Sequence, residues 1–271
     1  MITSTANEKV RYVRSLHRKP VRHKENRFIV EGMRLIEEMK EAGQEPVFVF
    51  CTELFSGRPR AIALLQTLRA SGTQVLGVSD QVMRAMADTK TPQGVLAVSR
   101  FPQIAPVHSA LTLVLDGVRD PGNLGTILRS AEAAAVGQVI TTKGTVDVFS
   151  PKVVRGGMGA HFRLPIRYDR EWQEIEAALD DRQVLLADPQ GDLPYYEVDW
   201  TKPSALIVGG EAQGAGREAR EFADRGVAIP MQAGVESLNV AVATSIMLFE
   251  AARQRSAQAH DLCSSRDGSF A

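Results

Sequence analysis

Short runs of branched apolar residues alternate with helical stretches along most of this 271-residue chain. The run Leu111-Thr-Leu-Val-Leu-Asp116 is almost continuously apolar, which is typical of a strand buried on both faces of a parallel sheet. An alanine-rich helical stretch, 124–136, follows this run and ends at Gly137. The alternation predicts an α/β fold built on a mostly parallel sheet.

The alternating pattern is interrupted once, by a stretch that contains Pro102 and Pro106 and shows no periodicity. We interpret this stretch as a linker between two domains. The polar, serine-rich end of the chain is predicted to be disordered. The predicted organisation is a small α/β domain over 1–100, a linker over 101–109, a larger α/β domain over 110–256 and a disordered tail over 257–271.

Each predicted domain has its own strands and helices. In the first domain a helix over 10–16 is expected to stop at Pro20, and the expected strands are 27–30, 46–51, 73–78 and 94–99. In the second domain a long amphipathic helix is expected from Ser237 to Arg255, and the strands after the first are expected at 138–142, 162–166, 183–187, 205–208 and 227–229.

Composition limits the class of protein. The content of hydrophobic residues (44%) and charged residues (24%) is ordinary for a globular protein that buries its own core. No apolar run approaches the roughly 18 residues that span a bilayer, and residues 1–10 lack an apolar signal-peptide core, so we expect a cytoplasmic protein. Cys51 and Cys263 have no metal-ligand spacing, and no disulfide framework or metal site is predicted.

Positive charge is concentrated near the N-terminus of a chain whose net charge is zero. Between Lys9 and Arg27 there are eight lysines and arginines against the single acid Glu25, a local net charge of +7. Such a segment is either a solvated helix face or a surface for an anionic partner, and the near absence of acids favours RNA. The predicted RNA-binding residues are Arg11, Arg14, Arg18, Lys19, Arg22, Lys24 and Arg27.

The loop after the first strand of the second domain combines glycines with polar side chains. Gly117, Gly122 and Gly125 allow tight turns and a close approach of the backbone to a ligand. Asn123 stands at the helix entrance, and Arg129 lies off the apolar stripe of that helix, with donors that suit a phosphate. The alternative is that Asn123 only caps the helix and that Arg129 is only a surface charge.

Two later loops also follow strands and precede helices. Residues 209–216 contain four glycines, but their spacing fits neither a dinucleotide-binding loop nor a phosphate-binding P-loop. A tight turn without a ligand explains the glycines equally well. Residues 229–240 make a sharp turn at Pro230 and place Ser237 and Asn239 at a helix start. Capping by Ser237 explains that serine but not Asn239.

Taken in order, these three loops resemble the sequence motifs of the SpoU/TrmH family of SPOUT methyltransferases. The matching segments are Asn123-x-Gly125-x-x-x-Arg129, Gly209-x-Glu211-x-x-Gly214, and Ile229-Pro-Met231 with Ser237-Leu-Asn-Val240. The resemblance implies an enzyme that uses S-adenosylmethionine to methylate a ribose 2′-hydroxyl of RNA. It also implies a SPOUT domain with a deep trefoil knot, and a homodimer.

The resemblance further implies roles for individual residues. S-adenosylmethionine would be held near the residues Gly209, Gly210, Ile229, Met231 and Leu238. Arg129 would bind the RNA phosphate and organise the 2′-oxygen, and Asn123 would position Arg129 or the ribose. Glu211 would orient these side chains through charge-assisted hydrogen bonds. Ser237 and Asn239 would shape the substrate end of the pocket.

The N-terminal domain is similar to the substrate-binding domain of rRNA-type family members, which has the fold of ribosomal protein L30e. The segments that carry this likeness are Asn7-Glu-Lys-Val and Arg27-Phe-Ile-Val-Glu-Gly-Met-Arg34. It favours 23S-type ribosomal RNA as the substrate. The alternatives are a tRNA 2′-O-methyltransferase, a non-catalytic RNA-binding or ribosome-assembly protein with a vestigial cofactor pocket, and a small-molecule nucleotide-dependent enzyme.

Two positions depart from the pattern of the family. Many members carry Asn or Ser where this chain has Gly210, and a Ser is more usual where this chain has Gly157. Both departures could alter local contacts with RNA, but neither removes a residue to which we assign chemistry.

Overall fold

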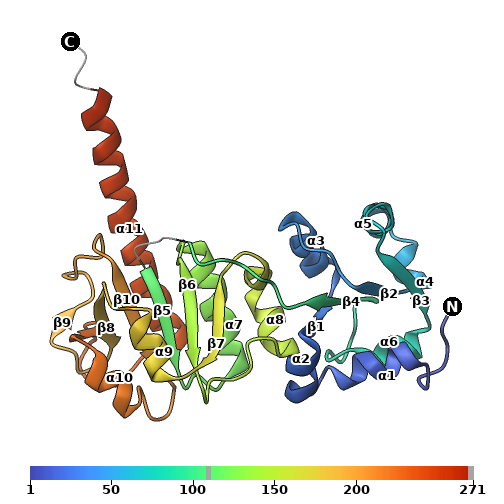
Figure 1. The fold of residues 1–271 in the computed structure, drawn as a ribbon, viewed down its shortest axis with the longest axis horizontal. Coiled ribbons are helices and arrows are strands. Elements are labelled where there is room, and N and C mark those ends of the chain that lie inside the picture. The colour runs from blue at the N-terminus through green and yellow to red at the C-terminus, as the bar shows by residue number, and fades with distance from the viewer. Residues whose placement is uncertain (108–110, 268–271) are drawn as a thin grey trace. The chain divides into compact units, whose positions relative to one another are not determined.

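The computed structural model describes residues 1–107 and 111–267 and divides into two compact units (Figure 1). The first unit joins Met1–Gln103 to a later segment, Asp147–Arg163, and the second joins Ile104–Val146 to Leu164–Ala271. The first unit therefore consists of two separate stretches of chain. None of the helices in the described ranges is both long enough and apolar enough to cross a membrane.

The first unit is built on a four-stranded mixed sheet in the order β1-β4-β2-β3. Strand β4 is antiparallel to both of its neighbours, whereas β2 and β3 are parallel. The strands are β1 (Arg27–Glu31), β2 (Phe48–Thr52), β3 (Gln74–Val78) and β4 (Val95–Arg100). The helices are α1 (Glu8–Ser15), α2 (Lys19–Glu25), α3 (Met33–Glu41), α4 (Glu53–Ser56), α5 (Pro59–Ala70), α6 (Asp80–Met86) and α8 (Pro151–Gly157), with a short 3₁₀ helix at Ala160–Phe162.

The apolar stripe of α1 anchors the N-terminal segment in the core of this unit. Val10, Val13 and Leu16 recur at helical spacing, and all three are fully buried in a cluster with Phe50 and Met86. The opposite face of α1 carries the arginines. The expected stop at Pro20 is instead the start of α2, because proline at the beginning of a helix gives up only an N–H group that would lack a helical partner.

The second unit is built on a seven-stranded sheet in the order β7-β6-β5-β10-β8-β11-β9, with every strand pair parallel. The predicted parallel sheet is therefore confirmed. The strands are β5 (Leu111–Asp116), β6 (Gln138–Thr142), β7 (Ile166–Arg170), β8 (Gln183–Ala187), β9 (Leu193–Pro194), β10 (Ser204–Gly209) and β11 (Arg225–Ala228). The helices are α7 (Pro121–Ala133), α9 (Trp172–Ala177), α10 (Arg217–Phe222) and α11 (Val240–Asp267).

Helices cover both faces of the second sheet, as the buried strands require. Ile175 of α9 and Ala219 of α10 pack with Val114 and Ile207 of the two central strands. Helices α7 and α11 pack against each other on the opposite face (Figure 1). The loops that carry the sequence motifs leave the carboxyl ends of β5, β10 and β11, where ligands bind in parallel α/β sheets.

Two predicted elements differ from the structure. The strand expected at 162–166 begins only at Ile166, because Phe162 ends the 3₁₀ helix and packs against Phe28. Helix α11 continues through residues 257–267, where we had predicted disorder, and residues 268–271 lie outside the described part of the chain.

Candidate active site

The glycine-rich loop after β10 folds back on itself and leaves no space for side chains. The backbone groups of Gly210 and Gly214 hydrogen-bond to each other in both directions, with N···O distances of 3.0 and 3.1 Å. A Cβ atom on Gly209 would lie 2.1 Å from the nitrogen of Ala215, and one on Gly210 would lie 2.2 Å from the carbonyl oxygen of Gly117. A side chain at Gly210, where many relatives have Asn or Ser, therefore requires a different path for this loop.

Asp116, at the end of β5, holds the end of the same loop at Gly216 in place. One oxygen of its buried carboxylate accepts a hydrogen bond from the backbone N–H of Gly216 at 2.7 Å, and the other accepts one from the Thr142 hydroxyl at 2.9 Å. No role for Asp116 was predicted from the sequence. The signal was its position, because a buried acid at the carboxyl end of a central strand needs donors close by.

A chain of three polar side chains joins the three sequence motifs. Asn123 donates from Nδ2 to Oε1 of Glu211 at 2.8 Å, and Asn239 donates from Nδ2 to Oδ1 of Asn123 at 3.0 Å. Residues that lie 88 and 116 positions apart in the sequence are thus held by direct hydrogen bonds. Glu211 therefore contacts Asn123, one of the two side chains that we expect it to orient, and its role in orienting them stays a prediction.

Glu211 is the acceptor that organises one end of this chain. In addition to Asn123, it accepts hydrogen bonds from the backbone N–H groups of Arg119 and Asp120, both at 3.2 Å. Partial burial raises the pKa of the Glu211 carboxyl, but the donors around it more than offset that effect, so the pKa lies below its usual value. Glu211 is therefore an ionised anchor and not a proton donor at neutral pH.

Helix capping does not explain the contacts of Asn123, and it explains only part of those of Asn239. Asp120 caps α7 through hydrogen bonds from the backbone of Gly122 and Asn123, which leaves the side chain of Asn123 available to Glu211. Asn239, and not Ser237, accepts hydrogen bonds from the first amides of α11, those of Ala241 and Val242. Asn239 combines this cap with its bond to Asn123, because it has both an acceptor and a donor.

A cavity of about 450 Å³ opens beside these polar residues. Its size falls in the usual range for sites that bind small molecules. All five residues predicted to bind the cofactor line it, as do Glu211, Ser237 and Asn239, whereas Asn123 and Arg129 are not part of the lining. Gly214 and Val240, which belong to the sequence motifs, also line the cavity. The lining residues that sequence reasoning did not identify are Ala187, Asp188, Pro189, Val208, Ala243 and Met247.

The unpredicted lining residues include a charged one at the end of β8. Asp188 accepts hydrogen bonds from the guanidinium of Arg220 and the backbone of Gln190, at 2.7 and 2.9 Å. Burial raises the pKa of Asp188, but these two donors outweigh that effect and hold the pKa below its usual value. Its position at the carboxyl end of a parallel strand was the signal that could have found it.

Arg129 lies on the exposed side of α7. Within the described ranges, no residue forms a hydrogen bond or an ion pair with its guanidinium. Its neighbour Ser130 is within hydrogen-bond distance of Ser245 on α11, with 2.8 Å between the two hydroxyl oxygens. The helix that carries Arg129 is therefore fixed, while its five N–H donors remain available to a ligand.

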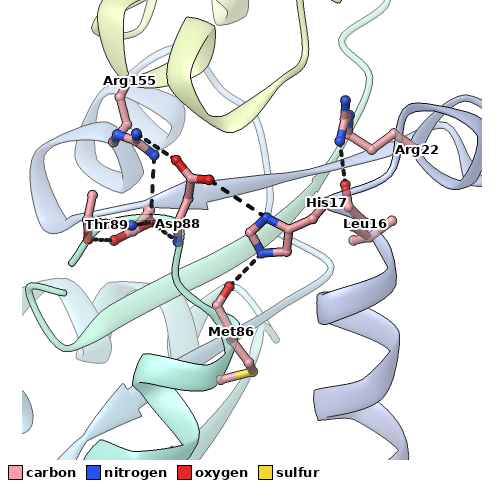
Figure 2. Close-up of polar contacts among 8 residues, drawn as sticks. Leu16, His17, Arg22, Met86, Asp88, Thr89 and Arg155 are labelled. Atoms are coloured by element: carbon pink, nitrogen blue, oxygen red, sulfur yellow. Dashed lines mark hydrogen bonds and ion pairs between the residues drawn. The ribbon is translucent and has the colours of Figure 1, made fainter. Parts of the chain in front are cut away.

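The predicted RNA-binding residues occupy different environments in the first unit. Five of them are exposed on or between α1 and α2, namely Arg11, Arg14, Arg18, Lys19 and Lys24. Arg27 is half-buried and donates to the Tyr12 hydroxyl at 3.2 Å. Arg22 is buried and donates to the Leu16 carbonyl at 2.7 Å (Figure 2). It also binds Asp147 at 2.9 Å, so it is not available to RNA. His17 also faces inward, with Nε2 2.8 Å from the Met86 carbonyl oxygen.

No group of three or more His, Cys, Asp or Glu residues is placed to hold a metal ion in the described part of the chain. What the second unit offers instead is a cavity with a backbone floor and apolar walls. Gly209 and Gly210 cannot carry side chains, and Ile229, Met231 and Leu238 provide the walls. This combination fits a ligand with a planar, partly apolar group that is recognised through backbone groups, and the adenine ring of S-adenosylmethionine is such a group.

Comparison with known families assigns both parts of the chain. Residues 110–249 match the model of the SpoU rRNA Methylase family, and residues 7–97 match that of the MRM3-like substrate binding domain. The chain is 34% identical to the 23S rRNA (guanosine(2553)-2′-O)-methyltransferase RlmP of Bacillus subtilis, covering 92% of this chain and 97% of the relative. It is 33% identical to the mitochondrial rRNA methyltransferase 3 of Homo sapiens, covering 93% of this chain and 73% of the relative.

A solved structure shows the same fold with a ligand. The S-adenosylmethionine-bound rRNA methyltransferase from Sinorhizobium meliloti superposes with a TM-score of 0.81 at 32% identity, covering 93% of this chain and 97% of that one. The predicted family and its methyl donor are thereby confirmed. This chain belongs to the SpoU rRNA methylase family of S-adenosylmethionine-dependent methyltransferases.

Proposed function

We propose that this protein transfers a methyl group from S-adenosylmethionine to the ribose 2′-hydroxyl of a guanosine in large-subunit ribosomal RNA. The observation that carries the proposal is the chain of hydrogen bonds from Glu211 through Asn123 to Asn239 at the mouth of the cavity. A pocket that had lost its catalytic role would not require these three side chains to be hydrogen-bonded to one another. The names of the relatives from Bacillus subtilis and Homo sapiens specify rRNA, and the first also specifies a guanosine.

Some residues around the cavity would bind the cofactor, and others would act on the RNA. When bound, S-adenosylmethionine supplies a methyl group already activated by its sulfonium. Gly209 and Gly210 would present backbone groups to it, between the apolar side chains of Ile229 and Leu238. With the donor between them, these side chains would hold it in one orientation and limit the entry of water.

Arg129 would act on the RNA. A ribose hydroxyl is a poor nucleophile, so its oxygen must be oriented and the negative charge that develops on it must be stabilised. The permanently charged guanidinium of Arg129 would bind the adjacent phosphate and provide that stabilisation. Asn123 sits six residues earlier on the same helix, where Glu211 and Asn239 keep its amide in one orientation.

The exposed cations of α1 and α2 would dock the RNA through its phosphates. Arg11 and Arg14 are exposed three residues apart on α1, and Arg18 is exposed in the short connection between α1 and α2. Phosphate contacts of this kind fix the position of an RNA and do not read its sequence. The match of residues 7–97 to a substrate-binding domain supports this assignment.

Two further features implied by the family belong to the same proposal. We expect the second unit to form the deep trefoil knot of SPOUT domains, with the loops after β10 and β11 and the start of α11 around the shared cavity. We also expect a homodimer, because Val242 and Phe249 expose apolar side chains along α11.

The replacement Arg129→Ala tests the proposed role of Arg129. We expect methyl transfer to fall at least about a hundredfold, as when an enzyme loses a donor that stabilises developing negative charge. Binding of S-adenosylmethionine should be unchanged, because Arg129 does not line the cavity. Transfer would be measured with tritiated S-adenosylmethionine on an unmodified large-subunit rRNA transcript, and cofactor binding by calorimetry.

Arg170→Ala is the matched control, because this half-buried arginine of β7 is paired with Glu174, four residues away, at an N···O distance of 3.0 Å and does not line the cavity. It should retain wild-type activity. Near wild-type turnover in Arg129→Ala would exclude the proposed role, and a wild-type protein that methylates no guanosine in the transcript would exclude the function.

A further inference from the structure

A second cavity, of about 460 Å³, adjoins the one described above. The two share Pro189, Ile229 and Met231 in their walls. The second cavity lies between the loop after β8 and the loop after β11, two strands that are neighbours in the sheet. Of the five predicted cofactor residues, all line the first cavity and only Ile229 and Met231 also line the second, so most of the second cavity is available to another ligand beside the methyl donor.

Close packing fixes the walls of this second cavity. A Cβ atom on Gly191 would lie 2.6 Å from the carbonyl carbon of Gly226, so the loop after β8 touches the backbone of strand β11. On the other side, the backbone N–H of Val235 donates to the carbonyl of Gln232 at 3.2 Å, and Gly234 has a φ of 90°. This is the geometry of a type II turn, which needs glycine at that position. The cavity is therefore formed before any ligand arrives.

Two acidic side chains in the lining of the second cavity differ in whether a charged partner balances them. Asp192 is paired with Arg225 at 2.9 Å, so its charge is already balanced. Glu236 is exposed, and no residue of the described ranges forms a hydrogen bond or an ion pair with its carboxylate. The next residue, Ser237, lines the first cavity. A carboxylate that offers only acceptors therefore stands at the boundary between the two cavities.

We propose that the second cavity receives the base of the nucleotide being methylated, and that Glu236 selects guanine. The proposal rests on the function given above, in which the ribose lies at the first cavity. Guanine is the one RNA base whose Watson–Crick edge carries two adjacent donors, N1–H and N2–H, and these match the two oxygens of a carboxylate. Bases of single-stranded RNA are commonly splayed out and read along this edge.

The effect of Glu236 would appear in the choice of base. Guanosine lacking its N2 amino group is inosine, which removes one of the two donors. For the wild type, we expect kcat/KM to fall about tenfold or more when the target guanosine is replaced by inosine, the size of effect expected for loss of a bidentate contact. In Glu236→Gln the amide oxygen can accept only part of this pattern, so guanosine and inosine targets should react at similar rates.

The test uses the full-length protein and an unmodified large-subunit rRNA transcript. The methylated guanosine is mapped by mass spectrometry and then replaced by inosine in a ligated transcript. Glu176→Gln, on the exposed side of α9, is the matched control and should discriminate as the wild type does. Binding of S-adenosylmethionine by Glu236→Gln, measured by calorimetry, should equal that of the wild type.

Two results would overturn the inference while leaving the proposed function intact. One is that Glu236→Gln methylates the mapped guanosine and still discriminates against inosine as strongly as the wild type. The other is that Glu236→Gln binds S-adenosylmethionine more weakly, which would make the second cavity part of the cofactor site. A wild type that transfers no methyl group to the transcript would instead overturn the proposed function, and this inference with it.

Discussion

His161 is a buried polar residue that the proposed chemistry does not use. Its Nε2 lies 2.7 Å from the Val148 carbonyl oxygen, so that nitrogen carries the proton, and its buried Nδ1 has no hydrogen-bond partner in the described part of the chain. A Cβ atom on Gly157 would lie only 2.9 Å from the His161 ring. This clearance explains the glycine at a position where serine is more usual in the family. The sequence showed that departure, but the ring that requires it became visible only in the structure.

Burial makes the stability of the protein depend on the protonation of His161. Desolvation lowers the pKa of His161 to about 4, although the Val148 carbonyl and Asp147 act in the opposite direction. The unfolded chain takes up a proton below its usual pKa of about 6.5, while the folded protein does not. Stability is therefore fully present above that pH and decreases as the pH falls from about 6.5 towards 4.

We predict that the free energy of unfolding decreases by about 2 kcal/mol more between pH 7 and pH 5 in the wild type than in His161→Leu. Urea unfolding at the two pH values measures the difference. Other titrating groups contribute equally to both proteins, so the comparison isolates His161. Equal pH dependence in the two proteins would show that His161 is protonated as easily in the folded state as in the unfolded chain.

The segment Asp147–Arg163 contains an element that the sequence predicted, in a unit that the sequence did not predict. The cap at Ser150-Pro151 predicted helix α8, and α8 is present. The unit to which α8 belongs was not predictable, because that depends on pairs far apart in the sequence. Arg22 binds Asp147 across 125 positions. Figure 2 shows a second such pair, Arg155 with Asp88, 67 positions apart. Helical and strand periodicity report on neighbours within a few residues and contain no information on such pairs.

The ion pair between Arg22 and Asp147 contributes to the free energy of unfolding, and this contribution can be measured. Burial raises the pKa of Asp147, but the guanidinium of Arg22 outweighs it and holds the pKa below its usual value. Removing one partner of a buried ion pair leaves the other charge uncompensated, so we predict that Asp147→Ala lowers the free energy of unfolding by about 3–5 kcal/mol. The double variant Arg22→Met/Asp147→Ala should recover part of this loss. Chemical denaturation measures both.

The exposed ion pair of Arg60 and Glu37 provides the control for the buried one. Both of its partners contact solvent, so Glu37→Ala should leave the free energy of unfolding nearly unchanged. If Asp147→Ala were as harmless as Glu37→Ala, the segment Asp147–Arg163 would not depend on the buried pair for its place in the first unit.

At the scale of the whole molecule, alternation of strands and helices was sufficient to predict a parallel α/β sheet, because each buried strand leaves a local signature. The site was predictable only in part. Residues of the three loops were found as motifs, but Asp116 and Asp188 were missed, because a single acid after a strand has no distinctive pattern. The hydrogen bonds of Asn123 to Glu211 and to Asn239 join residues 88 and 116 positions apart, and resemblance to a family, not periodicity, indicated that these loops meet.

The proposed homodimer is likewise a property that no local pattern specifies, and it can be tested on α11. Val242 and Phe249 are seven residues apart, so they lie on one face of the helix, and their exposed fractions are 48% and 51%. Exposed apolar side chains aligned in this way favour a self-complementary contact. Wild-type protein should sediment with twice the 29.5 kDa mass of one chain.

We predict that Val242→Asp/Phe249→Asp sediments as a monomer, because burying two carboxylates in an apolar contact is strongly unfavourable. Ile62→Asp is the matched control, since Ile62 of α5 is comparably exposed, at 43%, but belongs to the first unit. This control should remain dimeric. Binding of S-adenosylmethionine by the double variant would show that its second unit is still folded. If the double variant bound the cofactor and also sedimented as a dimer, the contact would have to lie elsewhere than on this face of α11.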